Sequence, residues 1–395
     1  MRRISLYQLK KVFLMLCLFF FANGFTVGQK LEKLPLATHF EVGLQCSQLV
    51  KIKEISSNYD DDVLLARPTA LTVDSEKNLY IYDNMLVKIS KFDKNYRLIS
   101  SFMRSGRGPG ESAGGMTAEG GTHKIYYAHD SNLYVSDPLN NKVIVYSPTD
   151  GKHLKDIKLD KYGRDPFNPV VDSRGHLYAL NNTGGIIDEL DLNNKMTLIH
   201  TYLDGRLSNN CLIFKRKYAE VLPKDVLKRM SYRPELSDVG YDVYRDNQLI
   251  VFLFNPSTLF IFKDQKLMLE RNIYIQSVMD NYRKVAVKFL DGQKRIPHER
   301  KKFMGFSPMT MFITFFVDKD DDRFFYLTEF YENLNVYMFN QRGDLIKVLS
   351  YPTCYPDKQV FLYAKRNNLF YGLIGVDRNP IIFMEEKKKK EEKKR

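Results

Sequence analysis

Short apolar segments with alternating character, separated by turn residues, recur along most of the chain. The clearest set lies between Pro68 and Phe102, where four such segments are joined by turns that contain Asp, Asn and Ser. Alternation with a period of two residues is typical of strands, and short turns join antiparallel neighbours. The set therefore predicts a meander of four antiparallel strands.

The same arrangement returns at a regular interval. Leu-Tyr pairs begin at Leu79, Leu133 and Leu177, which stand 54 and 44 residues apart. Periods of 40 to 50 residues with four strands each are typical of propeller blades. We therefore predict an all-β fold, a six-bladed β-propeller of four-stranded antiparallel blades. The predicted units occupy, in order, residues 68–102, 124–157, 170–199, 248–269, 311–349 and 360–384.

Two features concern how such a ring closes and where it is interrupted. An open ring leaves a bare sheet edge, and Leu49–Ile55 alternates correctly to complete the last blade. Residues 223–230 begin with a proline and place three apolar side chains on one helical face. Residues 277–290 begin with Ser277 and also show helical spacing. We expect one or two short helical insertions between blades.

The N-terminus has the three parts of a secretory signal peptide. Four basic residues precede an apolar run over residues 12–22, and Ala22 and Gly24 fit a cleavage site before Phe25. An uncleaved anchor is the alternative. Cys17 follows Leu16, which is not the small residue that a lipobox requires. We expect a signal peptide over 1–24, a linker over 25–39, one propeller over 40–384 and a charged, disordered tail over 385–395.

Charge and cysteine content exclude some classes of protein. The formal charge of +13 falls to +6 without the first 24 and last eleven residues, so the body has no nucleic-acid signature. Three cysteines remain after the signal segment, Cys46, Cys211 and Cys354, far apart and without metal-ligand spacing. Their spacing predicts no disulfide framework and no zinc site. Two alternatives stay open: one disulfide bridge with one thiol left over, or three buried thiols.

The first unit resembles an NHL-type blade. The resemblance rests on Pro68-x-x-Leu-x-Val-Asp74, Asn78-Leu-Tyr-Ile-x-Asp83, Lys91-Phe-Asp93 and Gly106-Arg-Gly-Pro-Gly-Glu111. It resembles in particular the exported six-bladed β-propeller proteins common in Bacteroides-type bacteria. This resemblance implies a propeller fold, export and usually no assigned catalytic activity. It also implies lipid attachment in many members, which the missing lipobox does not match.

Two motifs resemble ligand-binding loops, but each lacks a residue that such a loop requires. The glycine stretch 106–110 is followed by Glu111, where a phosphate-binding loop needs lysine. Asp318, Asp320, Asp322 and Glu329 have the spacing of an EF-hand loop, but Arg323 stands where that loop needs glycine. We interpret the first as a link between blades and the second as a turn between strands. We expect no metal and no cofactor.

The remaining candidates are polar residues near the ends of the Leu-Tyr strands and in the glycine stretch, because propellers bind through equivalent loops of several blades. The candidate ligand-binding residues are Asp83, Asn84, Arg107, Glu111, Asp137 and Asn140. We expect a monomeric, exported, non-catalytic binding or scaffold module, periplasmic or associated with the cell envelope. Its partner would be an extracytoplasmic protein, peptide or glycan, with no nucleic acid and no transmembrane segment after signal removal. The alternative is a metal-dependent hydrolase or lyase, since six-bladed lactonases and NHL-type lyases share this fold.

Overall fold

The structure is a computed structural model. It describes residues 32–33, 37–39, 46–55, 65–115, 124–159, 167–180, 187–191, 196–198, 239–244, 247–254, 257–263, 266–278, 280, 314–321, 323–330, 333–352, 360–374 and 379–386. The predicted helix over 223–230 lies outside these residues. In the second predicted helical segment, residues 276–278 and 280 are helical and the rest is outside the described part.

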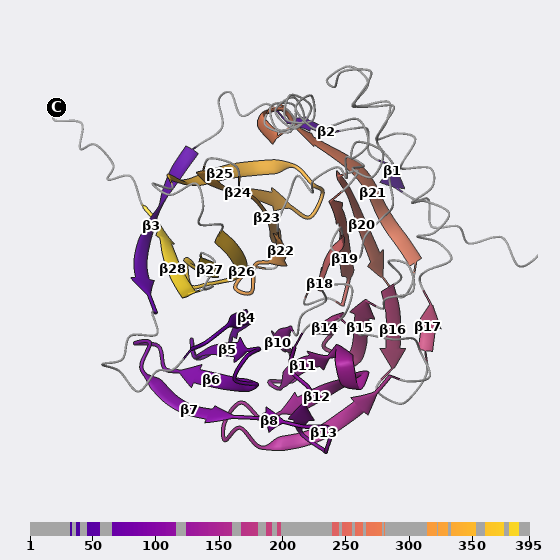
Figure 1. The fold of residues 1–395 in the computed structure, drawn as a ribbon. Helices are drawn as coiled ribbons and strands as arrows, with labels where there is room; N and C mark the ends of the chain where they lie inside the picture. Colours follow the sequence, from indigo (N-terminus) through magenta and orange to yellow (C-terminus); the bar gives the residue numbers. More distant parts are fainter. Residues whose placement is uncertain are drawn as a thin grey trace, which may run out of the picture.

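The described strands form a β-propeller, in which sheets are arranged as a ring around an axis (Figure 1). Within the described chain six four-stranded units follow one another. The strands of the first five are hydrogen-bonded in sequence order, and the sixth takes its fourth strand from the N-terminal segment. The first three units are β4 (Pro68–Val73), β5 (Leu79–Asp83), β6 (Lys88–Phe92), β7 (Leu98–Phe102); β10 (Ile125–Tyr127), β11 (Leu133–Asp137), β12 (Lys142–Tyr146), β13 (His153–Lys158); and β14 (Phe167–Val171), β15 (His176–Leu180), β16 (Ile187–Asp191), β17 (Met196–Leu198).

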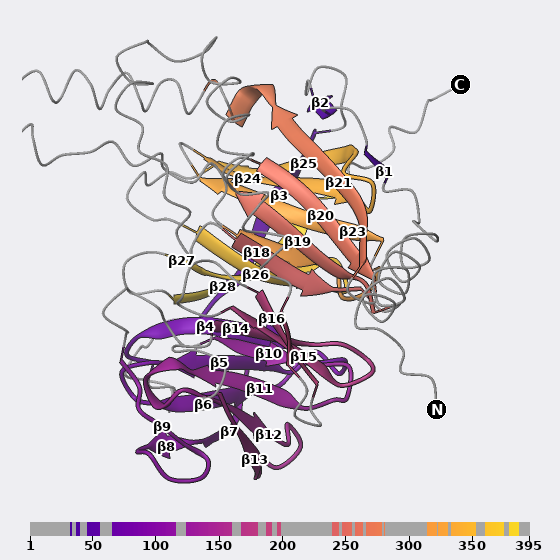
Figure 2. The same cartoon turned by 90° about the vertical axis from the view of Figure 1, so that its right-hand side faces the viewer.

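The second half of the ring has longer strands. Its units are β18 (Val239–Val243), β19 (Leu249–Phe254), β20 (Ser257–Lys263), β21 (Lys266–Ile275); β22 (Thr314–Val317), β23 (Phe324–Phe330), β24 (Asn333–Asn340), β25 (Leu345–Pro352); and β26 (Val360–Arg366), β27 (Leu369–Ile374), β28 (Asn379–Glu385), with β3 (Cys46–Glu54). Figure 2 shows the two halves from the side. Of the described helical residues, none belongs to a helix long and apolar enough to cross a membrane.

β3 supplies the predicted closing strand. It pairs antiparallel with β28, with Leu49 opposite Glu385 and Glu54 opposite Ile381. Its first residues also pair in parallel with β25, which joins the fifth and sixth units into one eight-stranded sheet. Leu49 is buried between these units, whereas Ile55 is buried against the first unit. The closing role of Leu49–Ile55 is therefore confirmed.

Two further N-terminal strands lie in the segment expected to be a linker. β1 (Glu32–Lys33) and β2 (Ala37–His39) both pair in parallel with β21, the last strand of the fourth unit. Together with β3, the N-terminal segment adds strands to the fourth, fifth and sixth units. The alternation of the sequence did not reveal these short pairings, because two or three residues carry no periodicity.

The repeated Leu-Tyr pair has a structural explanation. Leu79 packs in the core between the sixth and first units, and the next residue, Tyr80, packs in the core between the first and second. Successive strand residues point to opposite sheet faces, so one pair fills two neighbouring interfaces. Leu133-Tyr134 and Leu177-Tyr178 repeat this division at the following interfaces. The Tyr80 hydroxyl also donates to Asp74 Oδ2 at 2.9 Å, which ties the strand to its preceding turn.

Candidate functional site

The candidate residues gather where the first and second units meet, on the face of the ring that carries the β5–β6 and β11–β12 connections. We call this the loop cluster: residues 83–87, the glycine loop 104–115, and residues 137–141. β8 (Arg104–Ser105) and β9 (Glu111–Ser112) pair in parallel at the base of the glycine loop. Asn140 Nδ2 donates to the carbonyl of Gly106 at 3.0 Å, which fastens this loop to the β11–β12 connection.

Asp83 is fully buried and holds two segments of backbone. Its Oδ2 accepts the amides of Ala66 and Arg67 at 2.6 and 2.9 Å, and its Oδ1 accepts those of Met85 and Leu86 at 3.0 and 2.9 Å. The four bonds satisfy the carboxylate and fix the chain entering β4 beside the β5–β6 loop. Asp83 therefore shapes the loop cluster rather than offering a group to a ligand.

Asp137 plays the corresponding part in the second unit. It caps a single 3₁₀ turn, η1 (Pro138–Asn140), and its Oδ2 accepts from Asn140 Nδ2 at 2.8 Å and from the amide of Ala113 at 3.2 Å. Asn141, directly after the turn, adopts a left-handed conformation with φ of 52°. Asp137 and Asn140, both predicted, are brought together here, and their bonds hold the glycine loop.

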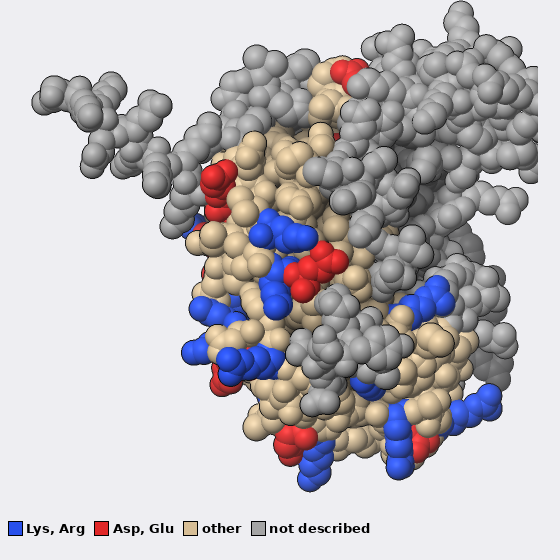
Figure 3. All heavy atoms as spheres, turned by 60° about the vertical axis from the view of Figure 1, so that its left-hand side comes forward, with Lys and Arg blue, Asp and Glu red and all other residues tan. Residues whose placement is uncertain are grey.

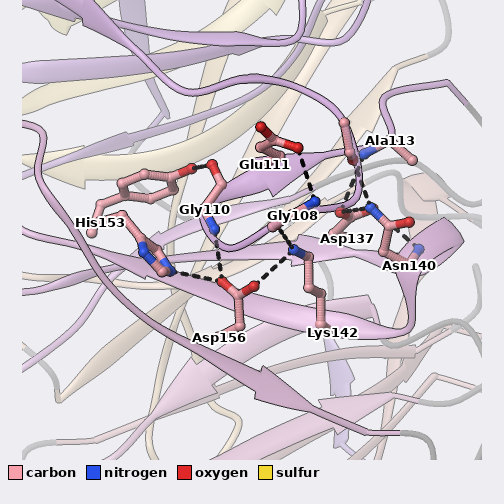
Figure 4. A network of polar contacts seen from close by, with 11 residues as sticks. Gly108, Gly110, Glu111, Ala113, Asp137, Asn140, Lys142, His153 and Asp156 are labelled. Atoms are coloured by element: carbon pink, nitrogen blue, oxygen red, sulfur yellow. Dashed lines mark hydrogen bonds and ion pairs between the residues drawn. The ribbon is translucent and has the colours of Figure 1, made fainter.

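The glycine loop is held by a second set of residues that the sequence did not reveal (Figure 4). Lys142 Nζ donates to the carbonyl of Gly108 at 2.9 Å and to Asp156 Oδ2 at 2.8 Å. Asp156 Oδ1 accepts from the amide of Gly110 at 3.2 Å and contacts His153 Nε2 at 2.8 Å. These residues come from β12 and β13. Their only sequence signal was a place on strands of the second unit.

The surroundings of Asp156 favour its charged form. Burial acts to raise the pKa of Asp156, but hydrogen bonds from Lys142 and His153, and then from the amide of Gly110, outweigh it and leave the pKa below its ordinary value. Gly110 has φ of 68°, and a Cβ there would lie 2.7 Å from the His153 ring. A side chain at this position would therefore be strained and would displace the loop.

Glu111 and Arg107 differ in their contacts within the loop: Glu111 is held by internal bonds, and Arg107 is exposed. Glu111 Oε2 accepts the amide of Gly108 at 2.9 Å, and its Oε1 pairs with Arg104 Nε at 2.8 Å. The hydrogen bond from Gly108, followed by the charge of Arg104, lowers the pKa of Glu111. Arg107 is exposed, and within the described part of the chain its guanidinium has no hydrogen bond or ion pair. Of the two charged candidates in this loop, Arg107 alone is left facing outward.

Asn84 is the one candidate with a buried polar atom that has no hydrogen-bond partner among the described residues. Only 5% of the residue is exposed, and its Oδ1 is buried without a hydrogen-bond partner. A buried acceptor without a donor is costly, so such an atom is worth examining as a contact. The backbone of Asn84 lies beside the glycine loop: a Cβ built on Gly114 would be 3.3 Å from the main-chain carbonyl oxygen of Asn84.

The loop cluster also exposes two apolar side chains that a search for polar residues missed. Met85 is 71% exposed and Leu139 is 47% exposed. They occupy equivalent positions, 54 residues apart, in the connections of two consecutive units. The available signal was their place beside Asp83 and Asp137, in loops that interrupt strands.

The acidic stretch 318–321 forms a turn between β22 and β23, as predicted. Asp318 Oδ1 accepts the amides of Asp320 and Asp321 at 3.0 and 3.2 Å, and its Oδ2 accepts from the Tyr326 hydroxyl at 3.0 Å. Asp322 lies outside the described residues. In the part of the chain that the structure describes, no group of three or more His, Cys, Asp or Glu side chains is placed to hold a metal ion.

A second cluster of polar side chains joins units on different sides of the ring axis. Lys319 Nζ contacts both oxygens of Asp242, at 2.9 and 2.7 Å, and lies 4.9 Å from the centre of the Tyr126 ring. The Tyr126 hydroxyl donates to Asp242 Oδ1 at 3.3 Å. The second, fourth and fifth units supply one residue each. Burial, followed by the charge of Asp242, raises the pKa of Tyr126 well above its usual range.

Comparisons with known proteins agree with the fold and do not identify the protein. No protein-family model and no curated protein match this sequence. A solved Bacteroides fragilis protein, provisionally described as exported, is similar with a TM-score of 0.50 and 11% identity, over 87% of this chain and 95% of that one. A streptogramin B lyase matches with a TM-score of 0.45 and 10% identity, over 86% of this chain and 87% of the other. Virginiamycin B lyase of Staphylococcus aureus matches with a TM-score of 0.45 and 11% identity, over 85% and 98% of the two chains. At these identities the likeness concerns the fold alone: the chain is a β-propeller.

Proposed function

We propose that this chain is an exported, non-catalytic β-propeller that binds a protein or peptide at the bacterial cell envelope through the loop cluster. The carrying observation is that three outward-facing side chains, Arg107, Met85 and Leu139, stand on loops whose buried carboxylates, those of Asp83 and Asp137, are held by internal hydrogen bonds. The proposal includes a signal peptide over residues 1–24, a six-bladed ring over residues 40–384 and a monomeric, periplasmic or envelope-associated product.

The chemistry of the cluster favours a peptide-like partner with an acidic group. Arginine and exposed methionine are typical of protein interfaces, where a guanidinium binds carboxylate and an apolar side chain fills a pocket. Fixed loops lose little conformational entropy on binding, which adds to affinity. A glycan offers fewer apolar groups for Met85 and Leu139.

The test compares binding of the chain beginning at Phe25 with that of two charge-reversed variants. An Arg107→Glu variant should lose at least about tenfold in affinity for solubilised envelope protein in a titration by biolayer interferometry. The reason is that the attraction between Arg107 and an acidic group of the partner becomes a repulsion between two carboxylates. Arg97→Glu is the matched control, since Arg97 is exposed in the β6–β7 turn at the other end of the strands. Equal affinities for the wild-type chain and R107E would contradict the proposed site.

Elemental analysis separates this proposal from the alternative of a hydrolase or lyase. The purified chain should contain no stoichiometric calcium or transition metal, and it should release no product from lactone or ester substrates. A stoichiometric divalent metal, with turnover that a chelator abolishes, would replace the binding module by an enzyme.

A further inference from the structure

Lys124, near the axis of the ring, is a partly buried lysine whose ammonium makes no hydrogen bond or ion pair with the described residues. It directly precedes β10, the innermost strand of the second unit. Its Nζ lies 5.0 Å from the centre of the Tyr363 ring, which belongs to β26 of the sixth unit. An ammonium can donate three hydrogen bonds, and the face of an aromatic ring attracts it without replacing an oxygen acceptor.

The other cations that lie over aromatic rings in the described chain show what is missing at Lys124. Each of them also contacts an oxygen atom. These contacts are Lys319 with Asp242 at 2.7 Å, Lys365 with Asp318 at 2.6 Å, Arg323 with Asp321 at 2.6 Å, and Lys91 with the carbonyl of Pro148 at 2.8 Å. Among these described pairs, only that of Lys124 and Tyr363 has no oxygen acceptor for its cation.

A buried hydroxyl group beside the same tyrosine also has no partner. Thr69, on β4 of the first unit, is 1% exposed, and its Oγ1 has no hydrogen-bond partner among the described residues. The Tyr363 hydroxyl donates to the main-chain carbonyl of Thr69 at 3.4 Å, so Tyr363 contacts both Thr69 and Lys124. A polar group buried without a partner is costly, and a ligand that supplies the partner removes this cost.

Lys124, Tyr363 and Thr69, which we call the inner site, come from three consecutive units of the ring. Their strands β10, β26 and β4 are the innermost strands of these units and lie side by side around the axis (Figure 1). Thr69 is the second residue of β4, and Lys124 directly precedes β10. Because the start of β4 pairs with Asp83 at the end of β5, the inner site lies at the same end of the ring as the loop cluster.

The unpaired positive charge of Lys124 is a local feature. Asp83, at this end of the first unit, already accepts four backbone amides. On the outer surface that Figure 3 brings forward, Lys and Arg lie scattered among Asp and Glu over the described residues and do not gather in one patch. The charge at the inner site therefore does not belong to a basic surface.

A carboxylate matches the groups of the inner site. It carries one negative charge, as the single ammonium requires, and its two oxygens can accept from an ammonium and a hydroxyl at once. A phosphate monoester carries nearly two negative charges, more than one lysine balances. The chemistry of the inner site therefore favours a carboxylate over a phosphate.

We infer that the inner site binds a carboxylate between Lys124 Nζ and the Thr69 hydroxyl, with the adjoining carbon chain against the Tyr363 ring. The carboxylate belongs to a free organic acid or to an acidic side chain of a protein. This inference does not depend on the binding role of the loop cluster.

Saturation-transfer NMR with butyrate tests the inner site in the chain that begins at Phe25, which keeps every described residue. Butyrate should bind, more weakly at high salt, and butanol should not bind. Lys124→Met should weaken butyrate binding at least about tenfold, because it removes a charge-assisted hydrogen bond, and Lys124→Arg should retain most of it. Thr69→Val should weaken it about threefold through the loss of one neutral hydrogen bond.

A capped tripeptide with one glutamate between two alanines separates the two sources of the carboxylate, since its only carboxylate is on a side chain. If the peptide binds more tightly than butyrate, and only when Lys124 is present, the inner site takes an acidic side chain of a protein. If butyrate binds more tightly, again only with Lys124, it takes a free organic acid.

Lys91→Met is the matched control. It also removes an ammonium that lies over a tyrosine ring, 5.7 Å from the centre of Tyr80, but that ammonium already donates to a carbonyl. Butyrate affinity should equal that of the wild type, and circular dichroism checks that every variant folds. No binding by the wild type, equal loss in K91M and K124M, or unchanged affinity in T69V would each overturn the inference.

Discussion

Asp156 links three segments because its two carboxylate oxygens face donors from different places in the chain. Lys142 lies on β12, His153 lies on the same strand as Asp156, and the amide of Gly110 belongs to the glycine loop. The side chains of Lys142 and Asp156 are 4% and 14% exposed, so water competes weakly for these bonds. The glycine loop is therefore anchored by one ion pair and its neighbours.

Asp156→Asn should loosen the glycine loop. Loss of the charge should cost about 1–3 kcal/mol at neutral pH, because Lys142 and His153 keep their donors but lose an anionic acceptor. Hydrogen exchange at Gly108 and Gly110 should accelerate, whereas Asp93→Asn, in the turn between β6 and β7, should leave it unchanged. Unchanged exchange in D156N would contradict the anchoring role.

The pH dependence of this effect has a definite sign. The folded chain lowers the pKa of Asp156, so its contribution to stability is complete above the ordinary value of about 3.9 and is lost as pH falls through the lowered value. The gap in unfolding free energy between wild type and D156N should thus be widest near neutral pH and close in acid. Denaturant titrations at several pH values measure it.

At this scale the sequence predicted the positions of several loop residues but not the contacts that hold them. Asp83, Asp137 and Asn140 follow strands of the repeat, and the structure does gather Asp137, Asn140 and Glu111 around one loop. Their internal bonds could not be anticipated, because an Asp that caps a turn and an Asp that binds a ligand occupy the same kind of position. Lys142 and Asp156 were missed, since the bonds that join them to the loop reach 34 and 46 residues back.

At the scale of elements, β3 closes the ring through contacts that alternation could predict in part. The sequence located the strand and its partner edge, since an open propeller would leave β28 bare. It did not show that Cys46 and Gln48 pair in parallel with Val348 and Ser350 of β25. Parallel pairing between segments some 300 residues apart leaves no local signal, and the same holds for β1 and β2 on β21.

Two truncations test how much β3 contributes. A chain that begins at Cys46 loses β1 and β2 and should remain soluble and folded, with a lower thermal midpoint. A chain that begins at Ser56 loses Leu49 and Ile55 from two buried clusters and exposes the edge of β28, so it should aggregate. Size-exclusion chromatography distinguishes them. Equal solubility of both chains would contradict the closing role of β3.

At the scale of the whole molecule, Lys319, Asp242 and Tyr126 join units that are not all neighbours in the ring. Lys319 and Tyr126 are 193 residues apart in the chain, yet Nζ and the hydroxyl oxygen lie at 3.4 Å. Asp242 is 5% exposed and also accepts the amides of Val243 at 2.9 Å and Val317 at 3.2 Å. No spacing rule identifies such a group. The repeat predicts the ring, but only the closed ring brings these three side chains together.

Lys319→Met should therefore destabilise the ring as a unit. Removing the ammonium leaves the Asp242 carboxylate buried without a cation, which costs about 3–5 kcal/mol in comparable buried pairs. Lys319→Met/Asp242→Asn should cost less than the sum of the single changes, with a coupling of about 0.5–3 kcal/mol in a double-mutant cycle from urea denaturation. Arg323→Met is the control: Arg323 pairs with Asp321 at 2.6 Å, but its side chain is 73% exposed, and its loss should cost at most about 1 kcal/mol. Two results would contradict this role: a loss of unfolding free energy in K319M no larger than in R323M, or additive effects of the changes at Lys319 and Asp242. Either would mean that the contact between Lys319 and Asp242 is local and does not stabilise the ring as a unit.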